Sequence, residues 1–125
     1  MNENELSNVV IKAAIEVHKE LGPGLLESVY EKCLVYELQQ LGLFVKSQIS
    51  LPLSYKNQQL DSGLRLDVIV EDKLILEIKS VQDFEPIHTA QLLSYLRLTN
   101  TKLGLLINFN VPLIKDGIKR IVNQL

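Results

Sequence analysis

Three ionisable residues interrupt two apolar segments in the middle of the chain. Asp67 lies within residues 65–70, and Glu77 and Lys79 lie within residues 74–79. Burying an unpaired charge in a strand costs several kcal/mol, so such groups are normally paired, solvated or bound to a metal. Two carboxylates can hold Mg²⁺, and a lysine beside them can position or help deprotonate a water. These residue types together indicate hydrolysis of a phosphodiester bond.

A hairpin would bring these side chains onto one face of a sheet. Side chains alternate across a strand, so those of Glu77 and Lys79 project on the same side. Pairing the residues that flank the break at 71–73 places Asp67 opposite Glu77 and Arg65 opposite Lys79, and it requires a loop with an odd number of residues. The other face would be wholly apolar core, formed by Leu66, Val68, Val70, Leu74, Leu76 and Ile78.

Four helices are predicted from apolar residues at helical spacing and from the residues that end such segments. Glycine and proline at residues 22–24 separate the first two helices, and Pro86 suits the first turn of the third. In the last helix, Ile114, Ile118 and Ile121 would face inward and the basic residues outward. The predicted helices cover residues 5–21, 25–41, 86–98 and 113–125.

Four strands are predicted between these helices. Ile49, Leu51 and Leu53 alternate with other residues, and Pro52 suggests an edge position or a strand end. The segment 103–109 has the length and apolar character of a strand buried on both faces. The predicted strands cover residues 44–55, 65–70, 74–79 and 103–109.

The element order α-α-β-β-β-α-β-α predicts a single α/β domain over residues 1–125, with helices packed against a mixed sheet. The strand that ends at Lys79 is followed by a helix and then by another strand, so we expect these two strands to be parallel. The length suffices for one hydrophobic core but not for two.

Composition narrows the class of protein. The chain is 46% hydrophobic and carries a formal net charge of −2, which does not favour tight, sequence-independent DNA binding, although the last quarter is locally basic. No apolar segment approaches the roughly 20 residues that span a bilayer. The acidic N-terminus lacks an apolar signal region, so we expect a cytoplasmic protein without a membrane partner. The single cysteine, Cys33, permits neither an internal disulfide nor a cysteine-based zinc site.

Four motifs in sequence order resemble the PD-(D/E)XK nuclease superfamily and, within it, the small GxxExxY family. The segment 24–30 spells GxxExxY, Asp67 supplies the acid, and residues 77–79 supply the E-x-K motif. The segment 91–96 resembles the QxxxY element of the exonuclease-like branch, and residues 105–110 look like the late strand of the family. The resemblance covers nearly the whole chain and implies a restriction-endonuclease-like core.

This resemblance implies roles for the matched residues. Asp67 and Glu77 would be metal ligands, helped by the backbone carbonyl of Ile78, and Lys79 would be the catalytic lysine. Glu27, at the start of the second helix, would reach the metal or a bound water. The implied cofactor is Mg²⁺, with Mn²⁺ as a substitute, and the implied partner is nucleic acid, with DNA favoured.

The third helix would supply further groups. Gln91 and Tyr95 lie one turn apart on the same helix face and would orient Lys79 or contact the substrate backbone. His88 shares that face and, like Arg65, would contact a substrate phosphate. Nuclease cores of this size often need a second subunit to embrace a duplex, so a homodimer is a further hypothesis.

Simpler interpretations stay open for each of these residues. The central charges could form a cross-strand salt-bridge cluster. Glu27 could simply be an acid that the helix dipole stabilises at the start of a helix. Tyr30 is interpreted as a packing residue, and His88 could be an ordinary solvated residue. The main alternative function is a nuclease-fold module that binds nucleic acid or a protein partner with little or no turnover.

Overall fold

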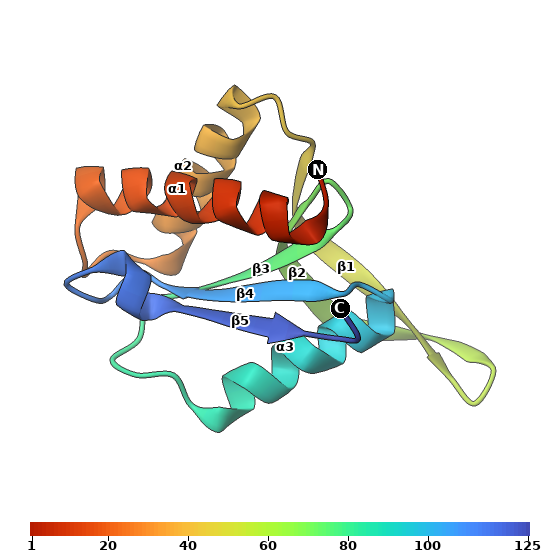
Figure 1. Cartoon of the computed structure of the whole chain (residues 1–125). Helices are drawn as coiled ribbons and strands as arrows, with labels where there is room; N and C mark the ends of the chain where they lie inside the picture. Colours follow the sequence, from red (N-terminus) through yellow and green to blue (C-terminus); the bar gives the residue numbers. More distant parts are fainter.

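The computed structural model describes residues 1–125 as a five-stranded sheet with helices on both faces (Figure 1). The strands follow one another across the sheet in the order β1-β2-β3-β4-β5. No helix is both long enough and apolar enough to cross a bilayer. The mixed α/β architecture is confirmed. Its elements are α1 (Glu3–Leu21), α2 (Glu27–Gln40), β1 (Val45–Tyr55), β2 (Gln58–Val70), β3 (Leu74–Lys79), α3 (Pro86–Thr99), β4 (Leu103–Asn108), a 3-10 helix (Ile114–Gly117) and β5 (Ile118–Val122).

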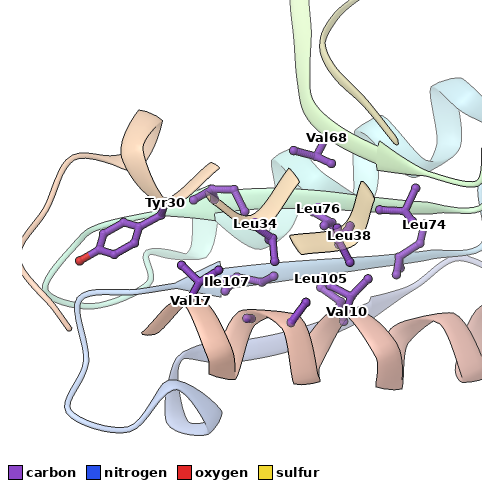
Figure 2. Packing of buried hydrophobic residues seen from close by; sticks show 14 of the residues in the cluster. Val10, Val17, Tyr30, Leu34, Leu38, Val68, Leu74, Leu76, Leu105 and Ile107 are labelled. Atoms are coloured by element: carbon purple, nitrogen blue, oxygen red, sulfur yellow. The ribbon is translucent and has the colours of Figure 1, made fainter. Parts of the chain in front are cut away.

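Helices α1 and α2 cover one face of the sheet. Apolar residues three and four apart give each helix a buried stripe, which packs on alternate residues of β2, β3 and β4. Asn2 begins α1 by accepting a hydrogen bond from the Glu5 N–H (2.8 Å). Figure 2 shows the central part of this core, with Val10, Val17, Tyr30, Leu34, Leu38, Val68, Leu74, Leu76, Leu105 and Ile107.

Helix α3 covers the opposite face and links two parallel strands. Strands β3 and β4 pair in parallel, as predicted from the helix between them, and Lys79 is the register partner of Asn108. Pro86 lies in the first turn of α3, also as predicted. The helix packs on a second core that includes Ile75 and Leu106. The end of β3 that carries Lys79 therefore lies beside the end of β4.

The predicted hairpin register is confirmed next to the turn. Val70 pairs with Leu74, Ile69 with Ile75, and Val68 with Leu76. The turn has an odd number of residues, and Glu71 and Asp72 both take the left-handed conformation (φ 53° each) that tight hairpin turns require. The ladder ends at Val68 and Leu76. The predicted backbone pairings of Asp67 with Glu77 and of Arg65 with Lys79 are therefore not part of the ladder.

The predicted position of Leu66 in the same core as Val68 is wrong. Leu66 packs with the α3 cluster, whereas Val68 packs with the α1/α2 cluster. On β1, Gln48 lies opposite Asp67, between the pairs Ser47–Val68 and Ile49–Leu66, and has a left-handed backbone (φ 53°), so regular side-chain alternation is interrupted on this strand as well. Accordingly, Val45 packs toward α1 and α2, whereas Leu51, an even number of residues later, packs toward α3. On β1 and β2, the side chains on the two sides of the Asp67 position therefore pack on opposite faces of the sheet.

The edge strand β1 agrees with the prediction from Pro52. It pairs only with β2, and the register shifts between Ser50 and Pro52. Strand β2 is longer than predicted, because it begins at Gln58 rather than at Arg65. The additional residues form a hairpin that extends beyond the rest of the sheet (Figure 1).

The predicted final helix over residues 113–125 is wrong. A 3-10 turn is followed by β5, which pairs antiparallel to β4, with Ile118 opposite Ile107 and Ile121 opposite Gly104. The isoleucines happen to follow helical spacing, but they are β-branched and suit a strand. Strand β4 is buried on both faces, so its free edge needs a hydrogen-bonding partner. The need of β4 for a partner strand therefore outweighs the helical spacing of the isoleucines.

Replacing Gly117 by alanine should destabilise the fold by roughly 1–3 kcal/mol. A Cβ at this position would collide with the Asn108 carbonyl oxygen and lie 3.0 Å from a methyl group of Val111. Urea unfolding of Gly117→Ala, with the exposed neighbour Asp116→Ala as control, measures the loss. Equal stability of the two variants would contradict the close approach of this turn to β4.

Candidate active site

Asp67 and Glu77 meet where the β2–β3 ladder ends. The Glu77 carboxylate accepts a hydrogen bond from the Asp67 N–H (3.0 Å), and the Asp67 carboxylate accepts one from the Ile78 N–H (2.9 Å). Each carboxylate thus takes the place of a backbone partner in the opposite strand. Glu77 is 3% exposed, and Asp67 is half-buried. The predicted juxtaposition of the two acids is present.

Burial raises the pKa of both carboxyl groups. Burial, followed by the nearby Asp67 charge, raises the pKa of Glu77 to about 8. Burial also raises the pKa of Asp67, although the Ile78 N–H and the Lys79 charge oppose that rise. The single ion pair of the chain joins Lys46 and Asp72 (2.8 Å), so the cross-strand ion pairs of the alternative interpretation are absent. The two acids lie together without a paired cation.

The metal-free protein should lose stability as the pH rises from about 4.5 to about 8. The folded state holds the Glu77 proton more tightly than the unfolded state, whose glutamates have the ordinary value near 4.5, so unfolding is favoured as this proton is lost. Denaturant unfolding in EDTA across this range measures the slope. The Glu77→Gln variant should show a shallower slope, and an equal slope in both proteins would contradict the assignment.

Lys79 ends β3 on the same side of the strand as Glu77. It lies two residues after Glu77 on one face of the strand, and its charge lowers the pKa of both carboxyl groups. Its side chain is half-buried, and its backbone carbonyl accepts a hydrogen bond from the Phe109 N–H (3.0 Å). The lysine is therefore near the acid pair while its amine makes no ion pair with it.

Tyr30 anchors the loop that leads into α2. Its hydroxyl donates to the Gly22 carbonyl (2.6 Å) and accepts from the Leu25 N–H (3.0 Å). Its ring stacks on Phe109 with centroids 4.5 Å apart. Gly24 takes a positive φ of 96°, which favours glycine. The interpretation of Tyr30 as a packing residue is confirmed.

Glu27 joins the start of α2 to the residue after Lys79. Its Oε1 accepts from the Ser80 N–H (3.3 Å), and the Ser80 hydroxyl donates to the Leu25 carbonyl (2.7 Å). Glu27 is exposed and lines a hollow of about 370 Å³ together with Asp67. No group of three acid, histidine or cysteine side chains lies close enough to hold a metal ion. Glu27 thus lines the same hollow as Asp67, but Glu27, Asp67 and Glu77 do not form a cluster of three metal ligands.

Glu31 and Gln48 are members of this hollow that the sequence prediction missed. The Gln48 amide donates to Glu31 Oε1 (2.8 Å) across 17 residues of sequence, and both side chains line the hollow beside Asp67. Burial raises the pKa of Glu31, and the charges of Asp67 and Glu27 add to the rise. The spacing of four residues between Glu27 and Glu31 on one helix face was the available signal.

Tyr95 and Gln91 share one face of α3, as predicted. Tyr95 is buried, and burial followed by the charges of Glu77 and Asp67 raises the pKa of its phenol. Tyr95 packs in the same core cluster as Ile75 of β3. Gln91 is exposed, and with Tyr95 it lines a second hollow of about 310 Å³.

His88 lies at the start of α3, and Arg65 lies on β2. The His88 Nδ1 accepts from the Glu85 N–H (3.0 Å) at the start of α3, and its ring stands edge-on to Phe84. Arg65 is exposed on the β1–β2 hairpin, where it pairs with Ser50. His88 thus caps a helix, and Arg65 lies two residues before Asp67 on the projecting strand.

Comparison with known proteins agrees with this fold. The profile of the PD-(D/E)XK nuclease superfamily matches residues 4–121. No curated protein and no solved structure matches the chain. The matched range includes all five strands except Val122, as well as the acid pair and the lysine. The chain therefore belongs to the PD-(D/E)XK nuclease superfamily.

Proposed function

We propose that this protein is a metal-dependent nuclease that hydrolyses phosphodiester bonds, with DNA as the favoured substrate. The observation that carries this proposal is the acid pair of buried Glu77 and half-buried Asp67, which meets without a paired cation beside Lys79. Membership of the superfamily supports a nuclease acting on nucleic acid. The segment from Gly24 to Tyr30 further supports placement in the GxxExxY branch.

The acid pair fits a divalent metal ion. Divalent metals are the general cofactors of the superfamily, and we propose Mg²⁺ here, with Mn²⁺ as a substitute. Asp67 and Glu77 would supply carboxylate oxygens, and the Ile78 carbonyl and Glu27 would assist directly or through water, since Mg²⁺ usually keeps several waters. When bound, the metal would neutralise charge on the phosphate and acidify a water.

The surrounding side chains would position the substrate and a water. The Lys79 amine would hold the attacking water and assist loss of its proton. Tyr95 and Gln91 would orient Lys79 or contact the nucleic-acid backbone from α3. Arg65, exposed on β2, would neutralise a substrate phosphate, and His88 would do so only if it leaves its position at the start of α3.

A second candidate function is binding without turnover. It is favoured by the hydrogen bonds that already engage each carboxylate with the opposite strand, and by the absence of a third gathered ligand. Such a module would keep the fold and bind nucleic acid or a protein partner. A homodimer that embraces a duplex would suit either function.

Cleavage assays separate these functions. Purified protein is incubated with single-stranded and double-stranded DNA and RNA, in Mg²⁺, in Mn²⁺ and in EDTA, and closed circles are compared with linear molecules. Cleavage that requires metal supports the nuclease, and cutting of closed circles identifies internal cleavage. Binding without cleavage under every metal condition supports the binding module and contradicts the nuclease.

A further inference from the structure

Asn108 is a buried polar residue at the end of β4, directly beside Lys79. The two residues are register partners in a parallel pair, so their side chains lie on the same face of neighbouring strands, which run about 4.8 Å apart. Asn108 is 2% exposed. A buried amide in an apolar strand costs stability unless its polar atoms form hydrogen bonds, so the Asn108 amide is expected to have hydrogen-bond partners.

The Asn108 amide binds the chain just after β3. Its Oδ1 accepts from the Val81 N–H (3.1 Å), and its Nδ2 donates to the Val81 carbonyl (2.9 Å). These are the two hydrogen bonds that a neighbouring strand would offer to Val81. The side chain therefore continues the β3–β4 ladder beyond Lys79, where the backbone pairing ends.

The residues that follow Lys79 are also held from the opposite side. Ser80 is bound through its N–H to Glu27 and through its hydroxyl to Leu25. Lys79 itself is bound through its carbonyl to Phe109. Segment 79–81 is thus fixed between β4 and the start of α2, and the end of the strand has little freedom to fray.

We propose that Asn108 is a positioning residue that holds Lys79 at the acid pair, a role that rests on the proposed function of Lys79. Direct contact with substrate does not fit this residue, because it is almost fully buried and its Oδ1 also accepts from the Asn110 N–H (3.1 Å). Its effect passes through the backbone of Val81 to the direction of the Lys79 side chain. Loss of the amide frees that segment without removing any ligand of the metal.

Asn123 provides a matched control. It is another asparagine whose amide binds backbone carbonyls, those of Thr101 (3.1 Å) and Leu96 (3.5 Å), near the other end of β4. Alanine at either position removes a buried or half-buried amide and should lower stability by roughly 1–3 kcal/mol. Only alanine at 108 should change the surroundings of Lys79.

The test is the rate at which an amine-directed acylating reagent modifies Lys79 in the native, metal-free protein at one pH. Peptide mass spectrometry reads the rate, with exposed Lys12 as internal reference. Because Lys79 is half-buried, Asn108→Ala should raise its rate about threefold or more relative to Lys12, as the segment gains freedom. Asn123→Ala should leave the ratio unchanged. An unchanged ratio in Asn108→Ala would overturn the proposal.

If Asn108→Ala does not fold, Asn108→Ser takes its place, because serine keeps a polar group but cannot span both polar atoms of Val81. The same rise in the Lys79 rate is expected, and no rise overturns the proposal. The acylation assay needs no turnover, so its result is independent of whether the wild type cleaves nucleic acid. Where cleavage is found, kcat should fall roughly 10- to 100-fold in Asn108→Ala with metal affinity unchanged.

Discussion

Glu77→Gln should make the metal-free protein more stable at pH 8 while removing its stabilisation by Mg²⁺. Wild-type Glu77 has a pKa of about 8 and is therefore partly charged at this pH, in a buried position beside Asp67. Glutamine keeps the oxygen that accepts from the Asp67 N–H but carries no charge, so unfolding should cost roughly 1–3 kcal/mol more. Thermal unfolding in EDTA and in Mg²⁺ measures both effects.

Glu37→Gln is the matched control for this variant. Glu37 is a half-buried glutamate of α2 that lines a hollow between α1 and α2, away from the acid pair. Its replacement should keep the shift in melting temperature that Mg²⁺ causes in the wild type. The assignment of Glu77 as a ligand is contradicted if Mg²⁺ stabilises Glu77→Gln as much as it stabilises Glu37→Gln.

Lys79→Ala should lower the rate of metal-dependent cleavage roughly 10²- to 10⁴-fold. The charge of this amine lowers the pKa of both carboxyl groups, and its removal leaves no side chain in that position to hold the attacking water. Metal affinity should not fall, because the lost charge is positive. Single-turnover cleavage rates and metal titration of the same variant measure the two effects separately.

Lys73→Ala is the control for general charge effects. Lys73 lies in the loop of the same hairpin, but its amine donates to the Met1 carbonyl (2.8 Å) at the other end of β3. This variant should cleave at nearly the wild-type rate. Equal rates for wild type and Lys79→Ala would remove Lys79 from the catalytic mechanism.

The central part of the site could be predicted because strand alternation leaves few alternatives. An odd loop and two apolar segments set the register next to the turn, and that register brings Asp67 and Glu77 together. The helix between β3 and β4 set their parallel arrangement. Glu27 and Tyr30 belong to the motif at residues 24–30, which is identified by resemblance to a family rather than by spacing.

The remaining features depend on contacts between distant parts of the chain. The inversion that moves Leu66 to the α3 face lies beside a left-handed Gln48, and glutamine rarely takes this conformation, so the sequence does not indicate it. The C-terminal segment became a strand because the edge of β4 needed a partner. In the sequence, Glu31 looks like an ordinary helix residue and Asn108 like an ordinary residue of a buried strand. Only the folded chain shows the hydrogen bonds that Glu31 makes with Gln48 and Asn108 makes with Val81.

The most direct test of the central claim, that Asp67 and Glu77 together bind a divalent metal, is a calorimetric titration with Mg²⁺ at pH 7. Titration in two buffers of different ionisation heat also counts the protons released. Because the pKa of Glu77 is about 8, binding of one metal ion should release close to one proton, and Asp67→Asn should abolish both binding and release. Absence of binding at millimolar Mg²⁺ or Mn²⁺, or binding that survives Asp67→Asn, would contradict the claim.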